Sequence, residues 1–231
     1  MIYSNDCWLK TTCKKYLNND ACECKFGDVY CPKLYKLDYL YSQANVPMCL
    51  RKPIGLTPTR VDEKVFEELS GIKSNINNFI KDGCNLYIFS KTTGNGKTSW
   101  SIKLLQEYFS NIWADTDLVC RGLFVNVPRF LIELKNNIGN KSDYIESIMN
   151  NVVSADIVIW DDIGTKVGTE FELEHLYTII NSRLELNKSN IYTSNSTPME
   201  LEKSLGLRIS SRITKLSHVV ELKGIDMRGL V

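Results

Sequence analysis

Residues 85–100 read "NLYIFSKTTGNGKTSW", a short strand pattern that leads into a glycine-rich turn and then into a helix pattern. The turn matches the loop Gly-x-x-x-x-Gly-Lys-Ser/Thr, which binds nucleoside triphosphates, but Lys91 occupies the place of the first glycine. That first residue mainly turns the chain out of the strand and does not itself surround the phosphates. The stretch therefore predicts a working phosphate loop of an unusual kind, with a plain two-glycine turn as the alternative.

The loop residues have different expected roles in binding ATP. Gly94 and Gly96 can adopt backbone angles that other residues avoid, which lets N–H groups point at phosphate oxygens. Lys97 would neutralise the β- and γ-phosphates, and Thr98 would hold Mg²⁺ through its hydroxyl. The helix that begins here adds the positive end of its dipole. The residues expected to contact ATP are Thr93, Gly94, Asn95, Gly96, Lys97, Thr98 and Ser99.

Residues 157–164, "IVIWDDIG", place two acids directly after four apolar residues of a buried strand. This pattern is typical of a Walker B strand, so Asp161 is expected to hold Mg²⁺, directly or through water. Asp162 is expected to orient and polarise the water that attacks the γ-phosphate. Many ATPases have glutamate there, and the shorter aspartate predicts slow hydrolysis. An acidic turn at the surface is the alternative.

Two further stretches add polar groups in the order that an ATPase needs. "IYTSN" (191–195) ends a strand with Asn195, whose amide can contact the γ-phosphate or the attacking water. "LGLRISSRI" (205–213) places Arg208 and Arg212 four residues apart, on one face of a helix. In an oligomeric ATPase such arginines can reach the γ-phosphate bound by a neighbouring subunit. Arginines exposed to solvent are the alternative.

From Val61 onward the chain alternates between helix and strand patterns. This order, with apolar strands, predicts an α/β fold in which helices cover both faces of a parallel sheet. The expected strands are 85–90, 122–127, 156–162, 189–195 and 218–224. The expected helices are 62–81, 97–109, 128–137, 141–154, 169–187 and two short ones at 198–205 and 207–216.

Bulk composition excludes some classes of protein. The 231 residues suffice for one domain with an appendage, and the net charge of +1 gives no general argument for nucleic-acid binding. No apolar run approaches the roughly 20 residues that cross a bilayer. The start, "MIYSNDCWLK", lacks the pattern of a secretory signal. We therefore expect a cytoplasmic protein without membrane contact.

Six of the eight cysteines fall in the first fifty residues. In a reducing compartment, such clustering indicates a metal rather than disulfides. Zinc requires four ligands, and five candidates stand at irregular spacing: Cys7, Cys13, Cys22, Cys24 and Cys31. An iron–sulfur cluster and plain reduced thiols are the alternatives. The predicted domains are a metal-stapled module at 1–46 that ends in a helix, a proline-rich linker at 47–60, and a core domain at 61–231.

The stretches "GNGKT", "IVIWDDIG", "IYTSN", "LGLRISSRI" and "ELKGIDMR" occur in an order that resembles the DnaC/DnaI-type loaders of replicative helicases, which are AAA+ ATPases. The resemblance covers roughly residues 61–231, and the cysteine-rich front end followed by "KLYKLDYLY" looks like the phage and Gram-positive mobile-element version. It implies an AAA+ P-loop core with little or no helical lid. It also implies ATPase activity, with Asn195 as the sensor 1 residue, Arg212 as the arginine finger and Arg228 as a sensor-2-like residue.

The resemblance further implies partners. The N-terminal module would grip a hexameric replicative helicase, while the core would oligomerise as a spiral, contact single-stranded DNA and hold the helicase ring open. The expected DNA contacts are Thr169, Phe171 and Lys166, since an aromatic ring can stack on a base and helix-start N–H groups can meet a phosphate. A core position for Phe171 and a solvated Lys166 are the alternatives.

Three other functions remain open at this point. A transposase-helper ATPase of the IstB type would share the core, although it does not usually carry such a cysteine module. A small-molecule kinase with a phosphate loop would need a substrate pocket and lid arginines acting within one chain. A zinc-bearing adaptor could bind ATP only to fix its shape, without significant turnover. Slow turnover stimulated by DNA or by a partner would indicate the loader.

Overall fold

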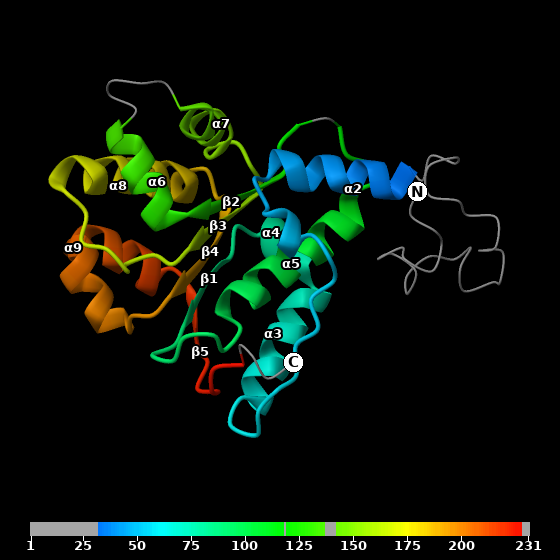
Figure 1. Cartoon of the computed structure of the whole chain (residues 1–231), viewed down its shortest axis with the longest axis horizontal. Coiled ribbons are helices and arrows are strands. Elements are labelled where there is room, and N and C mark those ends of the chain that lie inside the picture. The colour runs from blue at the N-terminus through cyan, green and yellow to red at the C-terminus, as the bar shows by residue number, and fades with distance from the viewer. Residues whose placement is uncertain (1–31, 118, 137–141, 228–231) are drawn as a thin grey trace.

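The computed structural model describes residues 32–117, 119–136 and 142–227. Its centre is a five-stranded parallel sheet in the order β2-β3-β4-β1-β5 (Figure 1). The strands are β1 (Asn85–Phe89), β2 (Gly122–Asn126), β3 (Ile157–Asp161), β4 (Ser189–Ser194) and β5 (His218–Glu221). The predicted α/β class with a parallel sheet is confirmed. Because all strands run the same way, their carboxyl ends meet at one edge, where α/β proteins bind ligands.

Helices cover both faces of the sheet, as the sequence predicts. They are α2 (Pro32–Gln43), a short 3₁₀ helix (Met48–Leu50), α3 (Glu63–Ser74), α4 (Ile76–Lys81), α5 (Lys97–Ile112), α6 (Val127–Asn136), α7 (Asp143–Asn151), α8 (Glu170–Glu185) and α9 (Pro198–Lys215). Successive strand residues point to opposite faces. Ile157 and Ile159 therefore join the core with α2 to α5, whereas Val158 and Trp160 join the core with α6 to α9.

Two helix interruptions distinguish the structure from simple helical patterns. The single helix expected over 62–81 is divided into α3 and α4, because Asn75 leaves helical backbone geometry with φ −113° and ψ 24°. The second interruption, at Gly206, has φ 77° and ψ 161° inside α9. That break separates the two short helices that the sequence predicts on either side of this glycine.

The helix predicted to close the N-terminal module, α2, packs into the same core as the sheet. Leu37, Leu40 and Tyr41 are buried there, and the Tyr41 ring lies 5.4 Å from the ring of Phe109 in α5. The main chain extends this contact, since Phe124 N in β2 donates to Ala44 O at 2.7 Å. In packing terms α2 thus belongs with the core domain, while the functional division at 46 and 60 stays a prediction.

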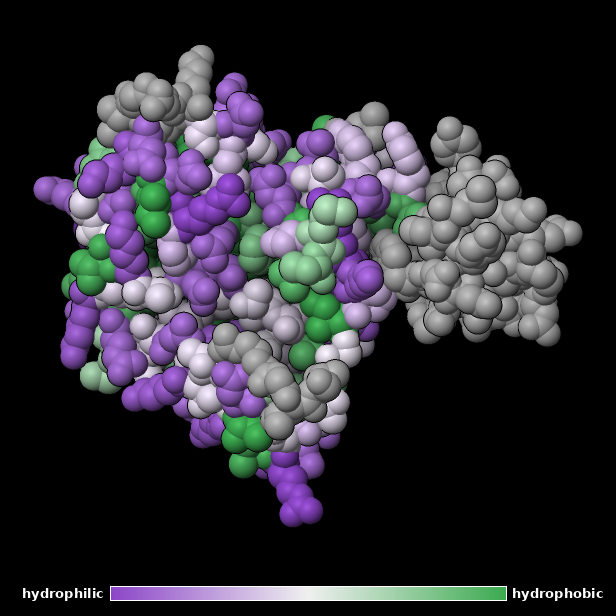
Figure 2. Space-filling model, viewed as in Figure 1, coloured by the Kyte–Doolittle hydropathy of each residue, from purple (hydrophilic) through white to green (hydrophobic). Residues whose placement is uncertain are grey.

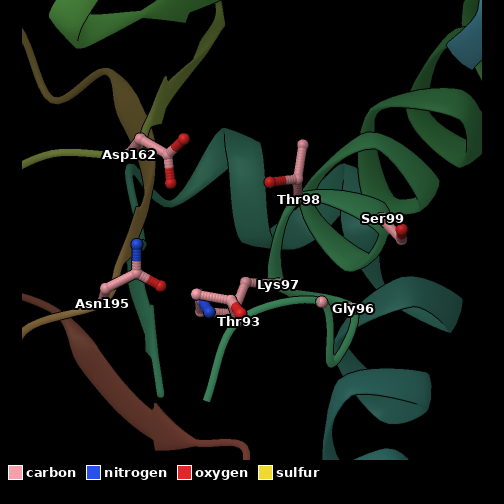
Figure 3. A pocket seen from close by; sticks show the side chains of 8 residues that line it. Thr93, Gly96, Lys97, Thr98, Ser99, Asp162 and Asn195 are labelled. Atoms are coloured by element: carbon pink, nitrogen blue, oxygen red, sulfur yellow. The ribbon is translucent and has the colours of Figure 1, made fainter. Parts of the chain in front are cut away.

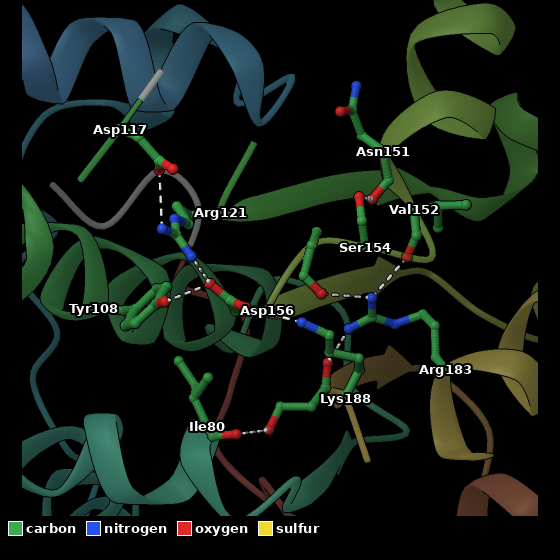
Figure 4. A network of polar contacts seen from close by, with 12 residues as sticks. Ile80, Tyr108, Asp117, Arg121, Asn151, Val152, Ser154, Asp156, Arg183 and Lys188 are labelled. Carbon is green, nitrogen blue, oxygen red and sulfur yellow. Dashed lines mark hydrogen bonds and ion pairs between the residues drawn. The ribbon is translucent and has the colours of Figure 1, made fainter. Parts of the chain in front are cut away.

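The amino edge of the sheet, opposite the carboxyl edge, contains a partly buried polar network (Figure 4). The Asp156 carboxylate accepts hydrogen bonds from Tyr108 Oη at 2.9 Å, Lys188 Nζ at 3.0 Å and Arg121 Nη1 at 3.4 Å. Burial alone would raise the pKa of Asp156, but the hydrogen bonds from Lys188 and Tyr108 lower it below its ordinary value. Nearby, the fully buried Arg183 of α8 donates to main-chain carbonyls. These bonds tie α8 to the starts of β3 and β4.

The described residues contain neither a membrane-spanning helix nor a cluster of metal-binding side chains. No helix among them is long and apolar enough to cross a membrane, and the face seen in Figure 2 is mostly hydrophilic with small scattered apolar areas. Nor do the described His, Cys, Asp and Glu side chains form a group of three or more that could hold a metal. The five predicted zinc ligands all precede residue 32 and lie outside the described residues, so zinc stays a prediction.

Candidate nucleotide-binding site

The loop between β1 and α5 has the backbone geometry of a phosphate-binding turn. Gly94 and Gly96 have φ of 70° and 100°, a region that side chains other than glycine rarely adopt. Asn95 is buried between them, and its amide donates to Ser90 Oγ at 2.6 Å and to Leu222 O at 3.1 Å. The Asn95 side chain therefore fixes the shape of the loop, which leaves only its main chain available to a nucleotide.

A cavity of about 360 Å³ opens beside this loop at the carboxyl edge of the sheet (Figure 3). Its lining comes from the loop, from the start of α5 and from the ends of β3 and β4: Thr93, Gly94, Gly96, Lys97, Thr98, Ser99, Asp162 and Asn195. Figure 3 shows Asp162 and Thr98 with their oxygens directed toward each other across the cavity. The structure thus brings together residues as far apart in the sequence as Thr93 and Asn195.

The cavity has the features of an anion site. Lys97 is only 6% exposed, and its Nζ donates to Thr92 O at 3.0 Å and lies 3.4 Å from Asn95 Oδ1. Lys97 is also the first residue of α5, where unpaired helix N–H groups and the helix dipole favour negative charge. A phosphate chain placed here would meet one ammonium group and several N–H groups.

Oxygen groups suited to Mg²⁺ lie next to the anion site. Asp161 ends β3 almost fully buried, and Thr98 Oγ1 donates to Asp161 Oδ1 at 2.8 Å. Mg²⁺ prefers carboxylate and hydroxyl oxygens together with phosphates, and it usually keeps several waters. The donor set fits Mg²⁺, with Thr98 and Asp161 as the residues that would hold it.

Asp162, the second acid, occupies a left-handed backbone conformation with φ 57°. Aspartate and asparagine tolerate this conformation better than most residues, because their short polar side chains can form local hydrogen bonds. This geometry gives a physical reason for aspartate rather than glutamate at the position. Asp162 N–H donates to Thr193 Oγ1 at 3.0 Å.

Three contacts of the site were missed at the level of sequence. Thr193 lies within the stretch "IYTSN", but the sequence pattern predicts a role only for Asn195, the polar residue at the end of that stretch. The segment after β5 also reaches the loop, since Met227 N donates to Gly94 O at 3.1 Å and Thr93 Oγ1 lies 3.4 Å from Asp226 Oδ2. The predicted sensor-2-like residue, Arg228, lies outside the described residues.

Lys91, the departure from the loop pattern, lies away from the cavity. Its side chain is exposed and pairs with Glu200 Oε1 at 3.5 Å. Glu200 also forms the capping box at the start of α9 with Thr197. Lys91 is absent from the cavity lining, as expected for a residue that only turns the chain out of β1.

The two arginines of α9 lie on a different surface from the cavity. Arg208 and Arg212 both stack on the Tyr177 ring of α8, with guanidinium carbons 4.4 and 4.6 Å from its centre. Arg212 Nε also donates to Asn181 Oδ1 at 2.7 Å. Because neither arginine lines the cavity of its own chain, a role in hydrolysis would need the nucleotide of another subunit.

The three predicted DNA contacts have local partners around the start of α8. Thr169 caps the helix reciprocally with Glu172, and Lys166 Nζ lies 3.2 Å from Glu172 Oε1. Phe171 is 42% exposed and packs against the ring of His175, 4.2 Å away between centres, so it is not a core residue. A contact of these residues with DNA stays a prediction.

Comparisons with known proteins add evidence about the family. No family model matches the chain. The replicative helicase loader DnaC of Escherichia coli (strain K12) is 24% identical over 130 residues, which make up 55% of this chain and 49% of that protein. The chain thus spans about half the length of the curated relatives it matches.

Solved structures agree on the fold. A DnaC helicase loader matches with a TM-score of 0.60 at 19% identity, over 72% of this chain and 93% of that one. A putative primosome component from Streptococcus pyogenes serotype M3 gives 0.59 at 21%, over 82% and 98%. The replication initiator DnaA bound to AMPPCP and single-stranded DNA gives 0.55 at 20%, over 70% and 46%. At such identities the likeness shows that this chain shares the fold of these proteins.

Proposed function

We propose that this chain is an ATPase that loads a hexameric replicative helicase onto single-stranded DNA. The observation that carries the proposal is the convergence of Lys97, Thr98, Asp161, Asp162 and Asn195 at one cavity, on the fold shared with DnaC. A phosphate loop alone occurs in many enzymes. The match to DnaC in both sequence and structure favours a loader over a small-molecule kinase.

The chemistry follows from the positions of these residues. Lys97 and the N–H groups at the start of α5 bind the phosphates, and Thr98 with Asp161 holds the metal ion. When bound, Mg²⁺ neutralises charge on the β- and γ-phosphates. Asp162 polarises the attacking water, and the amide of Asn195 orients it or contacts the γ-phosphate. Positioning and electrostatic stabilisation of this kind supply most of the catalysis in phosphoryl transfer.

The proposed partners extend this reaction to DNA replication. Residues 1–46 form the zinc-bearing module that binds the helicase, and copies of the core assemble so that Arg212 reaches a neighbouring nucleotide. Thr169, Phe171 and Lys166 contact single-stranded DNA. The proposal is supported by the similarity to the helicase loader DnaC, to a putative primosome component and to DnaA, which binds single-stranded DNA. We further propose that the protein is cytoplasmic and that it represents a phage or mobile-element version of the loader.

The decisive test is co-purification of the full chain with the replicative hexameric helicase of its host, with zinc measured in the same sample. We expect a stable complex, stoichiometric zinc and ATP turnover that rises when single-stranded DNA is added. Capture of a transposase in place of the helicase would indicate the IstB-type function. ATP binding without turnover, with or without DNA, would indicate the adaptor.

We predict that Arg212→Ala retains ATP binding and loses roughly a thousandfold in turnover, because a finger arginine stabilises charge that develops in the transition state. Mixing it with Asp162→Asn should restore part of the activity. In the mixture, an intact Arg212 of one chain can face an intact Asp162 of another.

The control for this measurement is Arg129→Ala. Arg129 also stacks on a tyrosine, with its guanidinium carbon 4.1 Å from the centre of the Tyr144 ring, but it lies on α6. Its loss should leave turnover unchanged. A mixture of Arg212→Ala and Asp162→Asn no more active than the sum of its parts would argue against a finger acting between subunits.

A further inference from the structure

A single hydroxyl contacts both acids of the site. Thr193 of β4 is 0% exposed, and its Oγ1 donates to Asp161 Oδ1 at 2.8 Å. The same oxygen accepts the N–H of Asp162 at 3.0 Å. A hydroxyl can donate and accept at once, which neither an amide N–H nor a carboxylate can do. Thr193 therefore links the side chain of the first acid to the main chain of the second.

This link fixes the orientation of Asp161. Thr98 Oγ1 from α5 and Thr193 Oγ1 from β4 both donate to Oδ1 of this carboxylate, each at 2.8 Å. Two donors on one oxygen restrict rotation of the carboxylate about its bond to Cβ. Threonine suits this role in a strand, because its branched side chain has few allowed χ1 rotamers.

The link also stabilises the turn at Asp162. A left-handed conformation costs an L-residue roughly 1–2 kcal/mol, and an inward N–H needs an acceptor. Thr193 supplies that acceptor through its side chain, and its carbonyl accepts Ile163 N–H at 2.9 Å. The next residue continues the pattern, since Ser194 Oγ donates to Ile163 O at 2.6 Å. The end of β4 thus holds Asp161, the last residue of β3, and the first two residues of the turn that follows, Asp162 and Ile163.

We propose that Thr193 is a positioning residue for the magnesium-dependent step of the reaction. It holds the Asp161 carboxylate against the Thr98 hydroxyl and keeps Asp162 in the conformation that faces the cavity. The inference rests on the proposed function, in that the cavity must bind ATP with Mg²⁺. Thr193 itself does not line the cavity, so it acts through the two acids.

The test is Thr193→Val, which keeps the branched shape and removes the hydroxyl. Affinity for a non-hydrolysable ATP analogue is measured with and without Mg²⁺ on the full chain. Without Mg²⁺ we expect a change of less than about threefold, while the gain in affinity that Mg²⁺ provides falls by roughly tenfold, the effect of losing one charge-assisted hydrogen bond. Turnover should fall by roughly tenfold to a hundredfold.

Two variants make the result specific. Thr193→Ser keeps the hydroxyl and should recover most of the magnesium effect and of the turnover. Thr178→Val makes the same chemical change at an exposed threonine of α8, whose hydroxyl bonds only to Glu174 O among the described contacts, and should leave both values unchanged. If Thr193→Val does not fold, Thr193→Ala removes the hydroxyl without adding bulk and tests the same expectation.

A purely structural role would lower the melting temperature and leave the ratio of affinities with and without Mg²⁺ intact. That result, or normal turnover of Thr193→Val, would overturn the proposal. Failure of the wild-type chain to bind the analogue at all would instead show that the proposed function is wrong, and this inference would fall with it.

Discussion

We expect Lys97→Ala to weaken ATP binding by roughly a thousandfold while the chain stays folded. The Lys97 ammonium group is nearly buried at the start of α5, and it is the charged group of the loop that lines the cavity. Losing two charge-assisted hydrogen bonds to phosphate removes about 4 kcal/mol, which corresponds to about three orders of magnitude in Kd. Titration with a fluorescent ATP analogue measures this change, and a thermal melt checks the fold.

The matched control is Lys91→Ala. Both lysines belong to the same loop, but Lys91 is exposed and forms only a surface ion pair with Glu200, an interaction worth at most about 1 kcal/mol. Its removal should change Kd by less than about threefold, within that small energy. Equal losses from the two variants would mean that the loop binds phosphate by overall charge rather than by position. Normal helicase loading by Lys97→Ala would contradict the proposed function.

The second large effect concerns stability. Arg183→Leu should lower the free energy of unfolding by about 3–5 kcal/mol, the usual result of removing one partner from a buried charged network. Arg183 donates to the carbonyls of Val152, Ala155 and Ser189 and to Oδ1 of Asn190. Burial lowers the pKa of the Arg183 guanidinium to about 10, which still leaves it charged at neutral pH. Leucine fills much of the space but removes the guanidinium donor from all four acceptors, although Asn190 Oδ1 keeps a hydrogen bond from Trp160 Nε1 at 3.1 Å.

Chemical denaturation measures this change, and a thermal melt should show a fall of roughly 10 °C for a chain of this size. Arg129→Leu is the control, since Arg129 is exposed and its stacking on Tyr144 contributes at most about 1 kcal/mol. Similar melting temperatures for the Arg183 and Arg129 variants would show that water or rearranged side chains satisfy the carbonyls. The network would then contribute little to folding.

Much of the core could be predicted because its physical signals are local. Each buried strand is a short apolar run, as in "IVIW" before Asp161, and each strand ends in polar residues. Since parallel strands place their ends at one edge, the sequence order of Lys97, Asp161, Asp162 and Asn195 already implied a shared site. The structure places three of these four in the cavity lining, with Asp161 bonded to Thr98 just behind it.

The remaining features depend on contacts between distant residues. The apolar periodicity of residues 32–43 predicts a helix, but it does not show whether that helix packs on a metal module or on the sheet. The packing depends on the surfaces of distant segments such as α5. The role of Thr193 depends on the register of β4 beside β3, which pairs Trp160 with Tyr192 and so brings the hydroxyl next to the acids. The left-handed angle at Asp162 is likewise a property of the assembled turn.

The packing of α2 has a thermodynamic consequence for the whole molecule. Helix α5 begins at the candidate phosphate site. Near its C-terminal end it contacts α2, where the Phe109 ring packs against the Tyr41 ring. Occupancy at one end of α5 and displacement of α2 at the other therefore act on the same hydrophobic core. If a ligand that displaces α2 lowers the affinity for nucleotide, then by reciprocity bound nucleotide lowers the affinity for that ligand by the same factor.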